Sequence, residues 1–205
     1  MNDLQILAPT LLEYWAVRRV LPQSHVVRTG VALARWDGAA AGSMLIVCGL
    51  AGALAAEVQP GTILVPEQAG LPDGRMMRCD AALVQALAEA ARALAIPVET
   101  GPMLTAPALV TGTDREVWAR RGFVGADMEA GLLADRGARV ATVRAVLDSP
   151  GRDISQLWLR PAEVMRRPRL WGELFWLSRA APTYALLAAR VLRAGLALLS
   201  VQEPA

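Results

Sequence analysis

The stretch GFVGADMEAGLLADRGARVATVRAVLDS, residues 122–149, decides the fold of this 205-residue chain. It predicts a short strand that runs into an acidic turn, then a helix over residues 130–135. A nearly unbroken apolar run at residues 140–147 follows, as in a strand that is buried on both faces. Glu129 and Asp148 are therefore expected at the ends of neighbouring strands, at the rim where open α/β sheets bind ligands.

The rest of the chain alternates strand-like and helix-like segments joined by short connections. Strands are predicted at residues 4–8, 26–30, 44–50, 63–66 and 103–110, and helices at residues 11–21, 80–94 and 114–122, with Asp80 as the cap of the second helix. Residues 71–78 read as a polar loop. This alternation predicts a single α/β domain over residues 1–205, with a mixed, mostly parallel central sheet that is flanked by helices.

Residues 154–200 differ from this body and predict an apolar helical C-terminal extension. From residue 154 onward seven arginines and three glutamates give a net charge of +4, whereas residues 1–153 carry 14 basic and 16 acidic residues. Tryptophan and arginine interleaved on amphipathic helices suit a membrane interface or an apolar ligand. The alternative is that these helices only cover the sheet.

Composition sets the cellular context that we expect. Hydrophobic residues make up 54% of the chain, but none of its stretches reaches 18 uninterrupted apolar residues, so we expect no transmembrane helix. The start of the chain has no basic region ahead of an apolar one, so we expect no signal peptide. Cys48 and Cys79 do not suggest a disulfide framework. These features predict a cytoplasmic protein.

Several common site types are excluded by the residues present. His25 is the only histidine, and one histidine with two distant cysteines cannot build a zinc site, so no metal is expected. A Walker phosphate loop is impossible because the chain has no lysine. The C-terminal arginines lie on apolar helices without a recognised motif, so we expect no nucleic-acid partner.

Two local patterns mark candidate binding positions near strand ends. Thr10 is a candidate N-cap, which places Glu13 in the first turn of a helix, where an acid suits the helix dipole with or without a chemical role. The segment Gly49-Leu50-Ala51-Gly52 predicts a tight turn whose small residues let backbone N–H groups approach a ligand.

Four blocks in this order resemble the purine nucleoside and uridine phosphorylase superfamily, which includes the methylthioadenosine/S-adenosylhomocysteine nucleosidases. Residues 47–54 with 59–66 resemble its glycine-rich block, residues 126–130 its "V-D/E-M-E-A/S" ribose-binding motif, and residues 143–148 its "V-R-A-I-S-D" motif. Residues 6–13 are similar to the first strand and turn of the nucleosidases. The resemblance implies a nucleoside phosphorylase-like fold.

The resemblance also implies roles for particular residues. Asp148 corresponds to the catalytic aspartate that shares a proton with the leaving base. Glu129 would accept hydrogen bonds from the ribose hydroxyls, and Met128 would pack on the sugar. Leu109 and Val110 would bracket the purine.

The two activities of the superfamily differ in the attacking nucleophile, which is phosphate in the phosphorylases and water in the nucleosidases. Phosphorylases hold phosphate with arginines and a serine, whereas Glu13, Val47 and Leu50 stand at the equivalent positions here. Glu13 resembles the water-activating glutamate of the nucleosidases, which favours hydrolysis. Inorganic phosphate remains the alternative co-substrate, with Arg28 as a candidate anion ligand, and no cofactor is expected.

Two features resemble the hopanoid-associated phosphorylases: the apolar residue at the second position of the Gly49–Gly52 block, and the C-terminal tail. That resemblance implies a lipid-linked nucleoside such as adenosylhopane as substrate and a peripheral location at the inner membrane face. Relatives of this kind also imply a homo-oligomer. The competing class is a non-catalytic nucleoside- or lipid-binding protein on the same fold.

Overall fold

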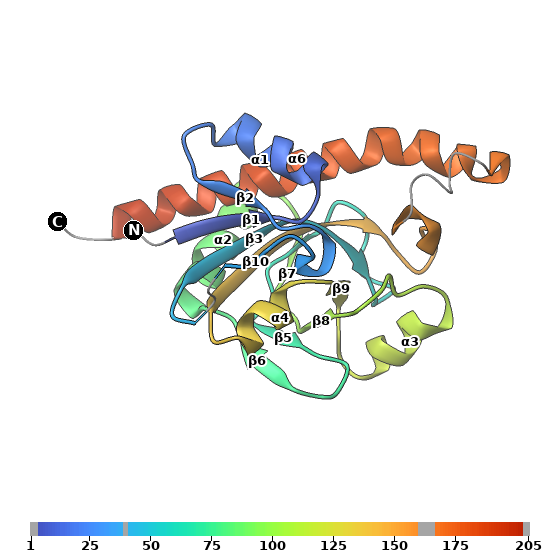
Figure 1. The fold of residues 1–205 in the computed structure, drawn as a ribbon, viewed down its shortest axis with the longest axis horizontal. Coiled ribbons are helices and arrows are strands. Elements are labelled where there is room, and N and C mark those ends of the chain that lie inside the picture. The colour runs from blue at the N-terminus through green and yellow to red at the C-terminus, as the bar shows by residue number, and fades with distance from the viewer. Residues whose placement is uncertain (1–3, 39–40, 160–166, 203–205) are drawn as a thin grey trace.

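The computed structural model describes residues 4–38, 41–159 and 167–202, which form an α/β unit around a ten-stranded mixed sheet (Figure 1). The strands are β1 (Leu4–Ala8), β2 (Val26–Arg28), β3 (Met44–Ala53), β4 (Ile63–Leu64), β5 (Gln68–Gly70), β6 (Met76–Arg78), β7 (Val98–Glu99), β8 (Met103–Thr105), β9 (Gly125–Asp127) and β10 (Arg139–Asp148). The helices are α1 (Leu11–Val20), α2 (Ala81–Ala93), α3 (Thr113–Arg120), α4 (Ala130–Asp135) and α6 (Trp171–Gln202), with 3-10 turns at Val31–Leu33, Gln156–Leu159 and Pro168–Leu170.

Strand β3 organises the sheet. It pairs in parallel with β10 along one edge, and along the other edge with β1 near its start and antiparallel with β9 near its end. The sheet order is β6-β5-β8-β9-β3-β10-β4-β7, with β1 and β2 beside the first half of β3. Six of the nine strand pairings are parallel, so the predicted mixed, mostly parallel sheet is confirmed.

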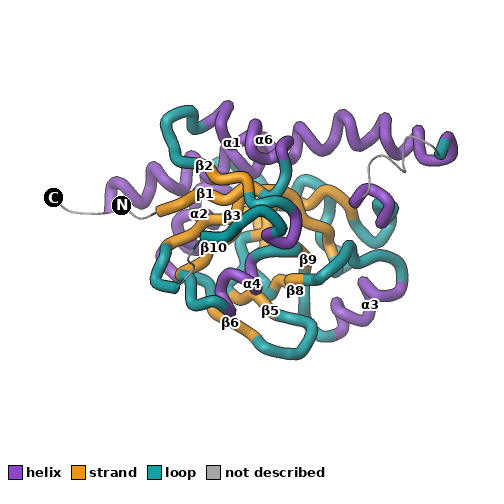
Figure 2. Tube along the Cα trace, in the orientation of Figure 1, coloured by secondary structure: helices purple, strands orange, loops and turns teal. Residues whose placement is uncertain are grey.

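Helices α1 and α2 both pack against α6, and α6 also contacts β3 and β10. Figure 2 shows α6 as one long helix that crosses the whole molecule, where the sequence had suggested more than one apolar helix. In its second half Ala185, Ala188, Ala189 and Leu192 are buried. Their spacing of three and four residues puts them on one stripe, and the small alanines let the helix approach the body closely.

By length and composition α6 could cross a membrane over Trp171–Ser200, within which an 18-residue window has a mean hydropathy of 1.3. The expectation of no such helix counted only uninterrupted apolar residues and so overlooked an apolar helix that arginines interrupt. One third of that 18-residue window is buried, and most of the buried residues of α6 lie in the second half of the helix. This half is therefore part of the core of the domain.

Local signals at two helix starts are confirmed. Thr10 caps α1 in a capping box, in which its hydroxyl accepts from the backbone N–H of Glu13 and the Glu13 carboxylate accepts from the N–H of Thr10. Asp80 caps α2 by accepting from the Leu83 N–H at 3.1 Å.

Three predictions about strand ends are wrong. Glu129 and Asp148 do not follow neighbouring strands, because β3 pairs with both β9 and β10 and lies between them. The segment Gly49–Gly52 does not turn, because it continues β3 and hydrogen-bonds to β10 and β9. Residues 71–78 are not simply a loop, because β6 pairs antiparallel with β5 around a tight turn that contains Gly74.

Candidate active site

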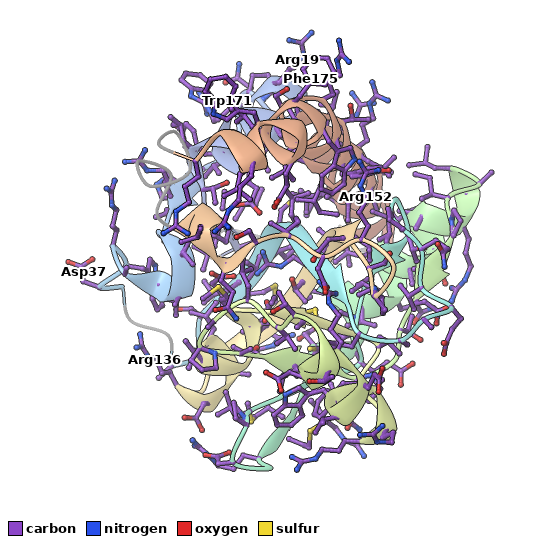
Figure 3. All side chains as sticks on the ribbon, turned by 90° about the vertical axis from the view of Figure 1, so that its right-hand side faces the viewer. Arg19, Asp37, Arg136, Arg152, Trp171 and Phe175 are labelled. Atoms are coloured by element: carbon purple, nitrogen blue, oxygen red, sulfur yellow. The ribbon has the colours of Figure 1, made fainter. Side chains whose placement is uncertain are left out.

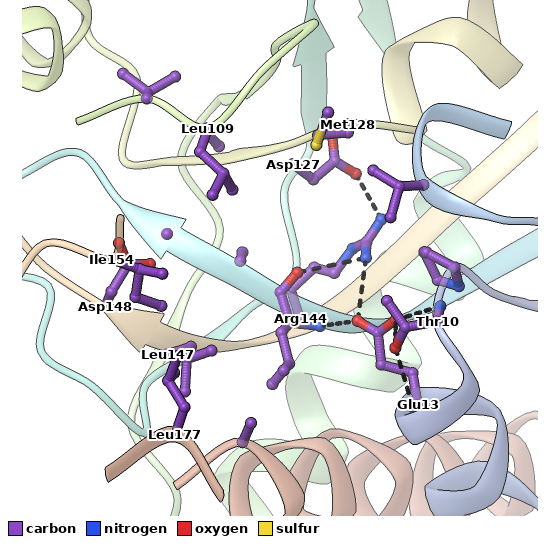
Figure 4. A pocket seen from close by; sticks show the side chains of 18 of the residues that line it. Thr10, Glu13, Leu109, Asp127, Met128, Arg144, Leu147, Asp148, Ile154 and Leu177 are labelled. Carbon is purple, nitrogen blue, oxygen red and sulfur yellow. Dashed lines mark hydrogen bonds and ion pairs between the residues drawn. The ribbon is translucent and has the colours of Figure 1, made fainter. Parts of the chain in front are cut away.

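A cavity of about 440 Å³ opens where the ends of β1, β3, β9 and β10 meet the first half of α6 (Figure 4). Its lining comes from segments that are far apart in the sequence: Pro9, Thr10, Glu13, Val31, Leu50, Ala51, Gly52, Leu54, Ala108, Leu109, Val110, Arg115, Ala126, Asp127, Met128, Glu129, Arg144, Leu147, Asp148, Ile154, Leu174, Leu177, Ser178 and Ala181. Most of these side chains are apolar. Four carboxylates and two arginines are the charged exceptions.

Glu13 is held tightly at one side of this cavity. Its Oε2 atom accepts from the backbone N–H of Thr10 at 2.7 Å and from the Thr10 hydroxyl at 2.6 Å. Its Oε1 atom accepts from the N–H of Leu50 at 2.7 Å. The carboxylate thus caps α1 and also ties α1 to β3, while it still faces the cavity.

Gly49 makes this tie between α1 and β3 possible. A Cβ atom at Gly49 would lie 2.2 Å from Oε1 of Glu13, far inside any real contact. Only glycine therefore lets the Glu13 carboxylate reach the N–H of Leu50. The glycine segment does bring a backbone N–H close to an acceptor, as predicted, but that acceptor is a side chain of the same protein.

Arg144 joins the acidic residues in the middle of the cavity. Its Nη2 atom donates to Glu129 at 2.7 Å and to Asp127 at 2.8 Å, and its Nη1 atom lies 4.0 Å from Glu13. Arg144 is only 1% exposed. A buried arginine is tolerated when its donors are satisfied, and here carboxylates satisfy them. Burial lowers the pKa of Arg144, but the negative charges of Asp127, Glu129 and Glu13 outweigh burial and raise it above its ordinary value.

Glu129 sits at the start of α4 and is fixed by two contacts. One carboxylate oxygen accepts from Arg144, and the other accepts from the backbone N–H of Ala32 at 2.8 Å. Burial raises the pKa of Glu129 to about 7, and the nearby charge of Asp127 also raises it, although Arg144 pulls it down. Glu129 can therefore change charge near neutral pH.

Asp127 holds the turn that carries Glu129. Its carboxylate accepts from the Thr105 hydroxyl at 2.7 Å and from the Ala130 N–H at 3.0 Å, in addition to Arg144. The Thr105 hydroxyl in turn accepts from the Gly131 N–H at 2.7 Å. The first N–H groups of α4 are thus satisfied by side chains, and the turn is anchored to β8.

Asp148 faces the cavity from the end of β10 and is paired with Arg115 of α3. Arg115 is 1% exposed, and it also donates to Asp153 at 2.6 Å and to the carbonyl of Ala53. Burial raises the pKa of Asp148, although the positive charge of Arg115 acts in the opposite direction. A Cβ at Gly52 would lie 2.9 Å from the Asp148 carboxylate, so this glycine also leaves room for an acid.

The structure brings most of the predicted site residues together. Asp148, Glu13, Glu129, Met128, Leu109, Val110, Leu50, Ala51 and Gly52 all line the cavity, and Gly49 lies directly behind Glu13. Figure 4 shows Asp148 on one side of the cavity and Glu13 with Thr10 on the other. Arg28 is different, because its side chain is exposed on β2 and it does not line the cavity.

Three charged residues of the site were not predicted as site residues. Arg144 carried a usable signal, because a charged residue within a run of buried strand residues requires buried partners. Asp127 stood beside Glu129 in the acidic turn. Arg115 gave no such signal, because residues 114–122 were predicted only as a short charged helix.

The cavity offers no free positive charge among the described residues that line it. Arg144 is shared by Asp127 and Glu129, and Arg115 is shared by Asp148 and Asp153. Within the described ranges we also find no group of three or more His, Cys, Asp and Glu side chains that could hold a metal ion. Carboxyl groups are therefore the side chains of this cavity that are suited to acid–base chemistry.

Comparison with known protein families identifies the chain. A family model described as the phosphorylase superfamily matches residues 22–167. The chain belongs to the phosphorylase superfamily. The match includes the glycine block, the Met128-Glu129 motif and Asp148, and it begins after Glu13. The predicted superfamily and the prediction of a nucleoside-cleaving enzyme are confirmed.

Solved structures share the fold of this phosphorylase-superfamily chain. Native futalosine hydrolase of Helicobacter pylori strain 26695 is 12% identical with a TM-score of 0.70, covering 95% of this chain and 97% of that chain. The 5′-methylthioadenosine/S-adenosylhomocysteine nucleosidase of Neisseria meningitidis, in complex with methylthio-immucillin-A, is 15% identical with a TM-score of 0.71, covering 96% and 99%. The nucleosidase of Colwellia psychrerythraea 34H, in complex with adenine, is 15% identical with a TM-score of 0.69, covering 96% and 95%. A search of curated proteins finds no match.

Proposed function

We propose that this protein cleaves the N-glycosidic bond of a purine nucleoside with an apolar 5′ substituent, with water as the attacking nucleophile. The observation that carries the proposal is the convergence of Asp148, Glu129 and Glu13 on one cavity in a chain of the phosphorylase superfamily. Structures of similar fold that are described as nucleosidases, one of them in complex with adenine, support the purine.

The reaction needs the base to leave as a neutral molecule while positive charge develops on the sugar. Asp148, whose pKa burial raises, is suited to hold a proton for the leaving base. An ionised Glu129 accepts hydrogen bonds from the ribose hydroxyls and stabilises the positive charge near the anomeric carbon. Met128 lines the same part of the cavity and packs on the sugar, and Leu109 and Val110 bracket the base.

Hydrolysis is favoured over phosphorolysis by the charges around the cavity. A phosphate dianion needs cations that are not already neutralised, and both lining arginines are shared between two carboxylates each. Arg28, the predicted anion ligand, does not line the cavity. Glu13 lies opposite Asp148, in a position to orient a water molecule toward the sugar.

An apolar 5′ substituent is suggested by the wall that α6 contributes. Leu147, Ile154, Leu177 and Ala181 form one buried cluster that faces the cavity. The resemblance of the tail to hopanoid-associated phosphorylases suggests adenosylhopane as the lipid-linked substrate. A homo-oligomer and a peripheral location at the inner membrane face, through the C-terminal helix, remain predictions of the same resemblance.

The test is a base-release assay with adenosine, methylthioadenosine, futalosine and adenosylhopane, each with and without inorganic phosphate. We expect free adenine from an adenosine with an apolar 5′ group, at a rate that phosphate does not change, and no sugar 1-phosphate. Asp148→Asn should lower this rate by about 10²- to 10⁴-fold. Asp153→Asn is the matched control, because Asp153 pairs with the same arginine outside the cavity.

Formation of a sugar 1-phosphate would show that phosphate, and not water, is the nucleophile. Cleavage of the N-glycosidic bond would still be supported. Nucleoside binding without release of base from any substrate would instead indicate the non-catalytic nucleoside- or lipid-binding class. If Asp148→Asn released adenine at the wild-type rate, Asp148 would not be the group that protonates the leaving base.

A further inference from the structure

Helices α1 and α6 expose matching rows of side chains on one side of the molecule. The row on α1 is Leu11, Trp15 and Arg19, and the row on α6 is Trp171, Phe175 and Arg179, each at spacings of four residues. The two helices pack against each other, and Figure 3 shows Arg19, Trp171 and Phe175 on the same side of the molecule, although the first turns of α6 extend past α1 in Figure 1. We call these six residues the α1–α6 face.

The α1–α6 face concentrates the exposed apolar side chains of the protein. The described residues expose eight large hydrophobic side chains, and four of them belong to this face. Trp15 is 61% exposed and Phe175 is 60% exposed. Single exposed apolar side chains are ordinary on a soluble protein, but several aromatic ones with arginines on one side of the molecule suit a membrane interface.

The charges on this face are positive. Arg19 and Arg179 end the two rows, and the Arg179 guanidinium lies 3.9 Å from the centre of the Phe175 ring, at the level of the aromatic side chains. The acid of α1 is Glu13, which is buried in the cavity. On α6 the one described acid, Glu173, is partly buried and accepts from the Ser155 N–H, so it does not neutralise the rows.

This combination of chemistry is complementary to an anionic lipid surface. Aromatic side chains are favoured at the headgroup level of a bilayer, and arginines beside them attract anionic lipids. A second copy of the chain fits less well, because a two-fold contact through this face would bring together two surfaces of the same positive charge. Spanning is also disfavoured, because the second half of α6 is packed against α1 and α2.

We infer that the α1–α6 face docks the protein on the surface of an anionic bilayer, with Trp15, Trp171 and Phe175 at headgroup level. The face lies at the rim of the cavity. Thr10, which lines the cavity, precedes the exposed Leu11, and Leu174 and Ser178 line it from the same turns of α6 that expose Phe175. Docking would bring the cavity mouth to the bilayer, and only this consequence rests on the proposed function.

The test is flotation of the full chain with vesicles of phosphatidylcholine alone and with vesicles that also contain phosphatidylglycerol. We expect binding to the anionic vesicles at low ionic strength, little binding to the neutral ones, and a loss of binding as salt is added. The double variant Arg19→Gln/Arg179→Gln should weaken partitioning by about fivefold for each arginine. Trp15→Ser/Phe175→Ser should weaken it by tenfold or more, because two aromatic contacts are lost.

Two variants elsewhere on the surface are the controls. Arg121 stacks over Trp118 as Arg179 stacks over Phe175, and Leu94 is exposed at the end of α2, so Arg121→Gln and Leu94→Ser should bind as the wild type does. Amide hydrogen exchange of the wild type adds a test that needs no variant. Vesicles should slow exchange in α1 and the first half of α6 and leave α2 unchanged.

Three results would overturn the inference. They are no binding to anionic vesicles at low salt, binding that the face variants leave unchanged, and a wild-type oligomer in sedimentation that the face variants dissociate. The last result would show that the face is a contact between copies of the chain. None of these results depends on base release, so failure here and failure of the proposed function are distinguished.

Discussion

The guanidinium of Arg115 donates to the carboxylate of Asp148, and both groups are buried at the side of the cavity opposite Glu13. The contact brings an arginine of α3 to the residue expected to carry the proton for the leaving base. A positive neighbour stabilises the ionised carboxylate, while burial stabilises its protonated form. Arg115 is therefore placed to limit how far the pKa of Asp148 rises.

The first prediction is that Arg115→Met extends activity to higher pH. Without the guanidinium the pKa of Asp148 should rise further, so the alkaline limb of kcat/KM should move to higher pH. Breaking a buried ion pair should also lower stability by about 3–5 kcal/mol, so the profile is measured well below the melting temperature. The readout is base release across pH.

Arg120→Met is the control for this experiment, because Arg120 lies on the same helix with its side chain 71% exposed. Its profile should superimpose on that of the wild type. If the alkaline limb of Arg115→Met also stays in place, Arg115 does not act through Asp148.

The second prediction concerns Gly49 and the position of Glu13. Gly49→Ala should displace the Glu13 carboxylate from the Leu50 N–H, because the added Cβ would lie 2.2 Å from Oε1. A buried N–H that loses its acceptor costs about 1–3 kcal/mol, so both melting temperature and base release should fall. Gly172→Ala is the matched control, because nothing lies within 4 Å of the Cβ it adds. A Gly49→Ala protein with wild-type stability would show that this close approach does not matter.

Sequence reasoning predicted those parts of the fold that depend on short-range signals. Thr10 and Asp80 cap their helices as predicted, since a cap is decided by residues within three positions of each other. The long buried strand β10 was also predicted, because an apolar run bounded by breakers is a local pattern. The start and end of these elements follow from the residues themselves.

The order of the strands in the sheet and the pairing of buried charges could not be predicted from short-range sequence signals. Nothing near Glu129 or Asp148 indicates that β3 lies between their strands, because that order is decided by which strands pair across the whole chain. Arg115 meets Asp148 across 33 positions of sequence, and its own neighbours are exposed charged residues. Long-range pairs of this kind leave no periodic pattern in a single sequence.

The third prediction is that Glu129 makes stability depend on pH. Burial raises its pKa from 4.5 to about 7, so the folded state holds the proton more tightly than the unfolded state does. The stability that this proton contributes is complete below about pH 4.5 and is lost as pH rises through 7. Relative to Glu129→Gln, the wild type should therefore lose about 3 kcal/mol of unfolding free energy between pH 4.5 and 8.

Urea unfolding of both proteins at several pH values measures this difference. Glu116→Gln is the control, because the Glu116 side chain is 70% exposed and its change should be small and independent of pH. Parallel stability curves for wild type and Glu129→Gln would contradict a raised pKa at Glu129.

The last prediction tests the apolar wall of the cavity with a series of adenosines that carry 5′-alkylthio groups of increasing length. Each buried methylene contributes about 0.8 kcal/mol, so kcat/KM should rise by up to about fourfold per methylene until the cavity is filled. Leu174→Glu places a charge at the rim of this wall, and the cost of burying it against the alkyl chain should flatten the rise. Activity on adenosine itself should change little, because adenosine has no group that reaches Leu174. Leu94→Glu adds the same charge far from the cavity and should keep the wild-type slope. A wild-type slope near zero would show that the 5′ substituent does not bind along α6.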